Sequence, residues 1–201
     1  MDEKLRERYE ALKAMVVRRK GPFDELIRFL EKETSWLTSP ASTRFHLCVE
    51  SGLLQHSVGV TETLLKLREC LAPQISEESC VIVALLHDVG KVGMPGKPLY
   101  LPNDNQWERE KRGVNYKYNP EVTTMGLAVR SLYLVSKYMP LSDAEAQAIC
   151  YHDGQYVTEN EVVAQEEEPL TLLLHWADYW TAMVHEEGVK VEEDTRYFER
   201  R

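Results

Sequence analysis

The sequence predicts an all-α fold, a single bundle of about seven helices. Two observations support this prediction. Apolar side chains recur at steps of three and four residues along most of the chain, and no segment shows the alternation of a strand with comparable strength. The 201 residues, of which 43% are hydrophobic and 28% charged, suffice for a globular domain with a substantial core. We therefore expect one domain rather than two.

Two helices are predicted near the N-terminus. The apolar positions are Leu5, Tyr9, Leu12, Ala14, Met15 and Val16 in the first helix, and Phe23, Leu26, Ile27 and Leu30 in the second. Each set falls on one face of a helix, so both helices are expected to pack on the rest of the chain. We assign residues 1–40 to this N-terminal layer, 41–188 to the main domain and 189–201 to a charged C-terminal tail.

A third and a fourth helix follow. The third opens at Gly52 and has the apolar positions Leu53, Leu54, Val60, Leu64 and Leu67. His56 lies on the same inward side of this helix. The fourth helix is expected to begin after Ser76, with acidic residues in its first turn where the helix dipole favours them. It is predicted to end at Gly90, which relaxes the backbone there.

A long segment, residues 91–120, separates these helices from the last three. Within it, Trp107 to Tyr118 is predicted to form a small hairpin around Arg112-Gly113. Loops of this length are often functional lids, and this loop is expected to select the substrate. Further helices are predicted from Glu121 to Met139, from Ser142 to Tyr151 and from Pro169 to Glu186. The acidic stretch from Glu159 to Glu168 is interpreted as a solvated loop.

Charge and composition exclude several classes of protein. The formal net charge of −9 opposes contact with a phosphate backbone, so long nucleic acid is disfavoured as a partner and small substrates are favoured. No secretory signal follows Met1, and the longest apolar run, Cys80 to Leu86, is too short to span a bilayer. We predict a cytoplasmic protein without a membrane segment. The four cysteines show no Cys-x-x-Cys pairing and are interpreted as reduced side chains rather than metal ligands.

The strongest chemical signal is the adjacent pair His87 and Asp88, which follows the apolar run directly and precedes Gly90. Burying an imidazole or a carboxylate is costly unless the group is paired or ligated, and a divalent metal satisfies both. Adjacent residues of a helix point about 100° apart, so both can face one ion only where the helix ends. The pair therefore indicates a metal site at the end of the fourth helix.

Three segments together resemble the HD superfamily of metal-dependent phosphohydrolases. They are Gly52-Leu53-Leu54-Gln55-His56-Ser57, Leu85-Leu86-His87-Asp88-Val89-Gly90-Lys91 and His175-Trp176-Ala177-Asp178, in the order that the family has. The resemblance implies a helical HD bundle in which His56, His87, Asp88 and Asp178 bind one divalent metal ion. Mixed nitrogen and oxygen ligands admit Mn, Fe, Co, Ni, Zn or Mg, so the identity of the metal stays open.

The HD domain of certain 3′-to-5′ exoribonucleases is a particularly similar relative. It has a His-rich turn where this chain has Arg44-Phe45-His46, and a His-His-Gly turn where this chain has His152-Asp153-Gly154. Those enzymes also carry an OB-type module, which has no counterpart in this chain. Family members with two metals use additional histidines in a region that corresponds to Glu121 to Gly126 here. This region of the chain contains no histidine, so one metal is favoured. His152 is expected near the substrate or at a weak second metal position.

Each candidate also has a plainer interpretation. His56 alone would fit a core histidine, Asp178 a hydrogen bond between helices, and Lys91 a solvated helix end, but the family pattern favours function for all three. His175 is interpreted as a supporting or core group and His185 as a surface residue. Phosphate contacts are conceivable for Arg44, Lys97, Arg109, Lys111, Arg112, Lys117 and Arg130, and stacking on a base for Trp107, Tyr116, Tyr118 and Tyr156. Surface charges and loop anchors are the more common roles of such residues.

The predicted function is metal-dependent hydrolysis of a phosphate ester of a nucleotide or similar small molecule. Asp88 is expected to act as general base, with Lys91 or His152 steadying the phosphate or the leaving group. Two alternatives stay open. One is a nuclease acting on short single strands, which the net charge disfavours, and the other is a non-catalytic HD module that binds a nucleotide. The sequence does not specify an oligomeric state.

Overall fold

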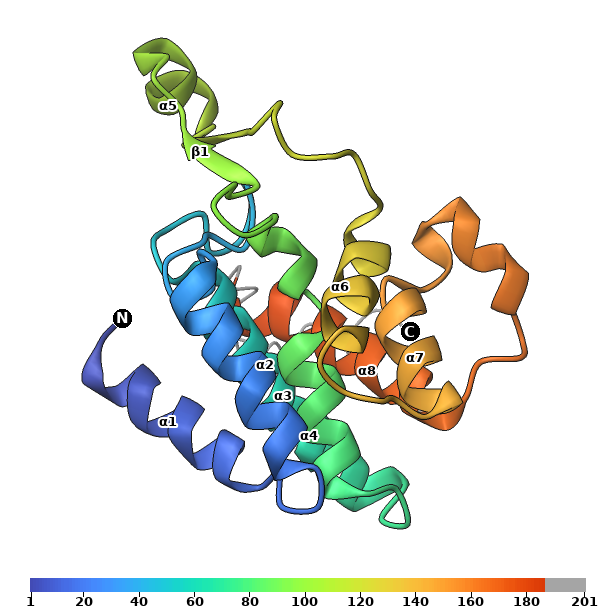
Figure 1. Ribbon diagram of the computed structural model, residues 1–201. Coiled ribbons are helices and arrows are strands. Elements are labelled where there is room, and N and C mark those ends of the chain that lie inside the picture. The colour runs from blue at the N-terminus through green and yellow to red at the C-terminus, as the bar shows by residue number, and fades with distance from the viewer. Residues whose placement is uncertain (187–201) are drawn as a thin grey trace, which may run out of the picture.

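The computed structural model describes residues 1–186, which form a mostly helical bundle (Figure 1), so the predicted all-α class is confirmed. The α-helices are α1 (Glu3–Ala14), α2 (Lys20–Glu33), α3 (Gly52–Leu71), α4 (Glu77–Leu86), α5 (Gln106–Arg112), α6 (Leu127–Ser136), α7 (Asp143–Tyr151) and α8 (Pro169–Trp180). The 3₁₀ helices are η1 (Val89–Val92), η2 (Gly154–Tyr156) and η3 (Thr158–Val163), and α8 continues into the π-helical turn η4 (Thr181–Glu186). The predicted tail 189–201 lies outside the described residues. Within residues 1–186, no helix has both the length and the apolar content needed to cross a bilayer.

The centre of the bundle is formed by α3 and α4. Helix α3 packs on α4 and α8, and α7 packs on both α4 and α8. In Figure 1, α1 and α2 lie against this central group. Leu5 of α1 and Phe23 of α2 share one buried cluster with Leu53 of α3 and Ile82 of α4. Each such side chain contributes about 1.5–3 kcal/mol on burial. The N-terminal helices and the central helices are thus joined by a common core, and the boundary at residue 40 stays a prediction.

The end of α4 differs from the prediction. The helix ends at Leu86 rather than at Gly90, and Asp88 leaves the helical conformation with φ −106° and ψ 8° before the 3₁₀ turn η1. Gly90 is required for close packing instead, because a Cβ atom there would lie 2.2 Å from the carbonyl oxygen of Leu127 in α6. The Gly90 N–H also donates to Ser131 Oγ of α6 at 2.8 Å. The close approach of α6, and not a flexible helix end, explains the glycine.

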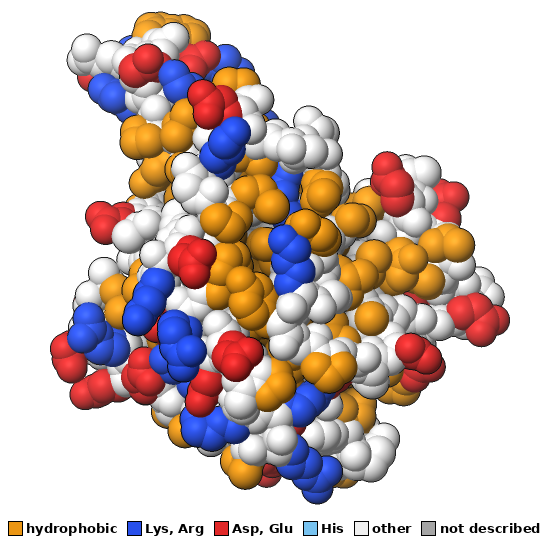
Figure 2. Space-filling model, viewed as in Figure 1, with side chains coloured by type: hydrophobic (Ala, Val, Ile, Leu, Met, Phe, Trp, Pro, Cys, Tyr) orange, Lys and Arg blue, Asp and Glu red, His pale blue; other side chains and the backbone are white. Residues whose placement is uncertain are grey.

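Residues 99–119 form an arm that projects from the bundle (Figures 1 and 2). Strands β1 (Tyr100–Pro102) and β2 (Tyr116–Tyr118) pair antiparallel in this arm. A small hairpin therefore follows the His-Asp pair, but the predicted hairpin over Trp107 to Tyr118 is wrong, because Gln106–Arg112 is the helix α5 and Gly113 ends it. Asn105 caps the start of α5 through its side chain, and Gly113 with φ 65° caps the end, which stabilises a helix between the two strands.

Helix α6 begins at Leu127, so the predicted start at Glu121 is wrong. The N–H of Glu121 donates to the side-chain oxygen of Asn119, and the buried guanidinium of Arg130 donates to the carbonyl oxygens of Thr123 and Gly90. These bonds satisfy the backbone without a helix. Residues 119–126 therefore form an irregular connection between the arm and α6.

Arg19, which precedes α2, joins the N-terminal helices to α4 and α7. Its guanidinium donates to the Glu145 carboxylate at 2.6 and 2.8 Å and to Glu78 Oε1 at 3.0 Å. Burial raises the pKa of Glu145, but the contacts with Arg19 and the Ser142 N–H outweigh it and lower this pKa below its ordinary value of 4.5. A carboxyl with a lowered folded-state pKa adds stability that is fully present above its unfolded pKa. That stability is lost as the pH falls through the folded pKa.

Glu145→Gln is expected to lower the free energy of unfolding by about 2 kcal/mol at pH 7, because Arg19 loses a charged partner. The difference from wild type should shrink as the pH falls below about 4, because the Glu145 carboxyl of the unfolded wild-type chain then binds a proton that the folded carboxyl resists. Urea titrations at pH 7 and at pH 3.5 measure both effects. Glu62→Gln is the matched control, because the half-exposed Arg8–Glu62 pair should contribute at most about 1 kcal/mol. An equal difference at the two pH values would contradict this role of Glu145.

Candidate metal centre

The side chains singled out from the sequence meet at one place in the bundle. His56 comes from α3, His87 and Asp88 follow the end of α4, His152 follows the end of α7, and Asp178 comes from α8. His87 is fully buried, and the other four side chains line a cavity of about 290 Å³. Helices far apart in the sequence therefore bring the three family motifs together.

Imidazole and carboxylate atoms face one another at this cavity. Asp178 Oδ1 lies 3.0 Å from His56 Nε2 and 3.8 Å from His87 Nε2. Asp88 Oδ2 lies 3.6 Å and 3.5 Å from the same two nitrogens. His152 Nε2 approaches Asp88 Oδ1 at 3.8 Å. Two sets of three ligand atoms, His56 with His87 and Asp178, and His87 with Asp88 and His152, are close enough together to hold a metal ion.

His87 and His152 are oriented in the same way. Nδ1 of His87 donates to the Ala84 carbonyl oxygen at 2.7 Å, and Nδ1 of His152 donates to that of Ile149 at 2.9 Å. Because a carbonyl oxygen only accepts, the neutral form of either ring presents a lone pair at Nε2. The buried Nε2 of His87 has no hydrogen-bond partner among residues 1–186, and burial lowers the pKa of His87 to about 4. A free, unprotonated imidazole nitrogen beside two carboxylates fits a divalent metal ion.

Glu186 is a site residue that the sequence analysis missed. Its carboxylate oxygen lies 3.0 Å from Nδ1 of His56, while Nε2 of the same ring contacts Asp178. Burial lowers the pKa of His56, but Asp178 and Glu186 outweigh this effect and raise the pKa to about 10. A carboxylate that accepts the Nδ1–H of a metal-binding histidine fixes the orientation of its ring. Glu186 ends the π-helical turn η4, and no local pattern distinguishes it from a surface acid.

Lys91 supplies a positive charge to the cavity. Its ammonium donates to Asp88 Oδ2, three residues earlier in the chain. Burial raises the pKa of Asp88, but the charge of Lys91 and the nearby histidines lower it more. The pKa of Asp88 therefore lies well below its usual range, and the carboxyl is ionised. Among the described residues, no other lysine or arginine lines this cavity. Lys91 shares the cavity with the carboxylates of Asp88, Asp153 and Asp178.

The other cations and aromatics of the arm lie away from the cavity. Arg109 donates to the Asn103 carbonyl, Arg112 faces Glu108, and Lys117 pairs with Asp104. Figure 2 shows basic and acidic side chains next to each other on the arm. In the structure, none of the residues 92–120 lines the cavity, so the expected lid does not cover it and the candidates Lys97, Lys111, Trp107, Tyr116 and Tyr118 are not part of it. Arg44 lies over the Phe45 ring, and Arg130 is buried against backbone carbonyls.

Three further histidines surround the centre or lie outside it. His175 contacts the His152 carbonyl oxygen through Nδ1 at 2.8 Å and so supports the turn that carries His152. A Cβ atom at Gly154 would lie 2.4 Å from the His175 ring, which explains the glycine in this turn. His46 tilts against His56 with 5.2 Å between ring centroids and faces Glu186 at 3.9 Å. His185 is exposed, as expected.

Comparison with known proteins agrees with this geometry. A search among curated proteins and a search among solved structures found no match. The family model described as HD domain matches residues 53–183, which include His56, His87, Asp88 and Asp178. The narrower resemblance to exoribonucleases is not confirmed by this match. Because the match covers more than half of the chain, the chain belongs to the HD domain family, whose members are in general metal-dependent phosphohydrolases.

Proposed function

We propose that this chain hydrolyses a phosphate ester of a nucleotide or similar small molecule at one metal ion held by His56, His87, Asp88 and Asp178. The observation that carries the proposal is the buried Nε2 of His87, which has no hydrogen-bond partner within residues 1–186 and lies 3.5 Å from Asp88 and 3.8 Å from Asp178. Leaving such an atom unsatisfied costs about 1–3 kcal/mol, and a bound cation removes that cost. When bound, a divalent ion lowers the pKa of a water molecule and neutralises charge on the phosphoryl group.

In the proposed reaction, Asp88 would transfer the proton and Lys91 would compensate the charge of the phosphate. Lys91 contacts Oδ2 of Asp88, so Oδ1 is the oxygen left to accept a proton from the attacking water. The water oxygen bonds to phosphorus, the ester P–O bond breaks, and the proton passes on to the leaving oxygen. The Lys91 ammonium offsets phosphate charge in the cavity. His152, 3.8 Å from Asp88 Oδ1, lies where it would contact the leaving group.

Metal analysis tests the centre directly. After incubation with Mn²⁺ or Zn²⁺ and removal of free metal, we expect about one ion per chain in the wild type. His87→Ala should weaken metal binding by at least about 100-fold. Replacing a residue that only supports a metal ligand already weakens metal binding by about 10–100-fold, and His87 is itself a proposed ligand. His185→Ala, which removes an exposed histidine, is the matched control and should retain the ion. Equal metal content in the two variants would rule out this centre.

A screen of phosphate esters on the metal-loaded wild type tests the reaction. Release of phosphate or cleavage of a diester among small molecules is the expected result. Cleavage of short oligonucleotides alone would favour the nuclease alternative. A protein that binds one ion and cleaves neither kind of substrate would overturn the hydrolase proposal in favour of a binding module.

A further inference from the structure

We propose that Tyr156 and Tyr179 form an aromatic platform beside the metal centre that binds the base of the substrate. The proposal rests on the proposed function and sharpens it, because it selects nucleoside phosphates over phosphates of sugars or simple alcohols. Throughout this section, "the platform" means the side chains of Tyr156 and Tyr179.

The platform is attached to the two chain segments that build the centre. Tyr156 ends the short helix η2, which follows the turn at His152, and Tyr179 follows Asp178 directly. The two rings lie nearly parallel, with 6.0 Å between centroids and 13° between planes. The His175 ring lies 6.3 Å from the Tyr179 ring, with 28° between their planes. All three rings line the metal-centre cavity, so a ligand held there by its phosphate lies next to them.

The platform is also largely exposed to solvent. Tyr156 is 80% exposed and Tyr179 50% exposed. An aromatic side chain that anchors a loop does so by burying its ring in the core, which Tyr156 does not. The two rings therefore keep solvent-facing surface that a third flat ring can cover. Stacking of a base on an aromatic side chain contributes favourably for every base, because each base has a π-face.

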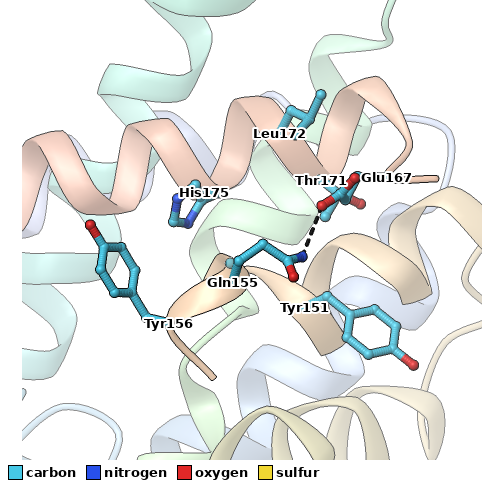
Figure 3. Close-up of a pocket in the computed structure, with 8 residues that line it drawn as sticks. Tyr151, Gln155, Tyr156, Glu167, Thr171, Leu172 and His175 are labelled. Carbon is cyan, nitrogen blue, oxygen red and sulfur yellow. Dashed lines mark hydrogen bonds between the residues drawn. The ribbon is translucent and has the colours of Figure 1, made fainter. Parts of the chain in front are cut away.

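A second cavity of about 370 Å³ lies beside the platform, within the size range of small-molecule sites. Tyr156 and His175 line both this cavity and that of the metal centre. Figure 3 shows these two side chains on one side of the second cavity, with Glu167 and Thr171 toward the other and Gln155 between. Gln155 Nε2 donates to Glu167 at 2.9 Å, so these two polar groups are held together in the wall. The shared residues make the two cavities neighbours.

The charges of the two cavities indicate how a substrate lies across them. The metal-centre cavity contains Lys91 and the carboxylates of Asp88, Asp153 and Asp178, whereas the second cavity contains the Glu167 carboxylate and no lysine or arginine from the described part of the chain. With the proposed divalent ion bound beside Lys91, a phosphate group is attracted to the first cavity, and the Glu167 carboxylate repels it from the second. The phosphate therefore occupies the metal centre, and the uncharged base extends over the platform toward the second cavity.

Adenosine 5′-monophosphate and ribose 5-phosphate are suitable probes, because only the first carries a base. Tyr156→Ala should raise KM for the nucleotide about tenfold with kcat little changed, since stacking acts on ground state and transition state alike. The ratio of kcat/KM between the two esters should fall by the same factor. Tyr156→Phe keeps the ring and should keep the ratio. Trp176→Ala is the control, because this exposed aromatic side chain of α8 lines neither cavity.

Binding of adenosine, which has no phosphate, separates this proposal from the proposed function. Calorimetric titration of metal-loaded protein measures the base contact without turnover, and Tyr156→Ala should weaken it about tenfold. That result supports the platform whether or not an ester is cleaved. An unchanged ratio between the two esters in Tyr156→Ala overturns the platform while the hydrolase proposal stands. Adenosine binding that is absent from the wild type, or equal in wild type and Tyr156→Ala, overturns it as well.

Discussion

Asp88→Asn is expected to lower kcat for ester hydrolysis by about 10³-fold, within the range attributed to a general acid or base. The amide keeps the size of the side chain and still accepts a hydrogen bond from Lys91, but it cannot take up a proton from water. Asp88→Ala is a poorer test of chemistry, because it leaves the buried Lys91 ammonium without its partner and so also weakens the fold.

Steady-state kinetics on metal-loaded Asp88→Asn, with thermal unfolding measured on the same sample, separates lost chemistry from lost structure. Asp104→Asn is the matched control, because Asp104 pairs with Lys117 on the arm and lies outside the cavity. The control should keep wild-type kcat. If metal-loaded, folded Asp88→Asn retains more than about a tenth of wild-type kcat, Asp88 is not the base.

Gly90→Ala is expected to lower the free energy of unfolding by about 3 kcal/mol, the upper part of the range for overpacked cores. The added Cβ atom would lie 2.2 Å from the Leu127 carbonyl oxygen and 2.9 Å from the Ser131 nitrogen, both backbone atoms of α6. Backbone atoms of a packed helix cannot move alone, so α6 or the turn with Asp88 and Lys91 must shift. Activity should therefore fall together with stability.

Urea unfolding and kcat measured on Gly90→Ala check both effects. Gly21→Ala is the control, since a Cβ atom there meets nothing within 4 Å and alanine favours the helix α2. The control should be as stable as the wild type or slightly more so. A Gly90→Ala protein with wild-type stability and kcat would show that the contact with α6 adapts freely.

The sequence by itself determined the helical class and most of the helices. Buried helices repeat their apolar side chains every three to four residues, so α1 to α4 follow from local pattern alone. Local pattern failed where side-chain hydrogen bonds, a cap or strand pairing hold the backbone. Helix α6 starts late because Arg130 and Asn119 bind the backbone before it, and Gly113 ends α5 between two paired strands.

The sequence also determined which residues are the candidate ligands, because the resemblance of three segments to the HD family implies His56, His87, Asp88 and Asp178 without a structure. Only the tertiary structure decided which groups support them. Glu186 reaches His56 across 130 positions of the chain, and Tyr156 meets Tyr179 only through the turn after α7. Arg109, Arg112 and Lys117 lie instead on the arm, where they contact its own polar groups. Site chemistry depends on distances between side chains, and the periodicity of a single helix does not encode those distances.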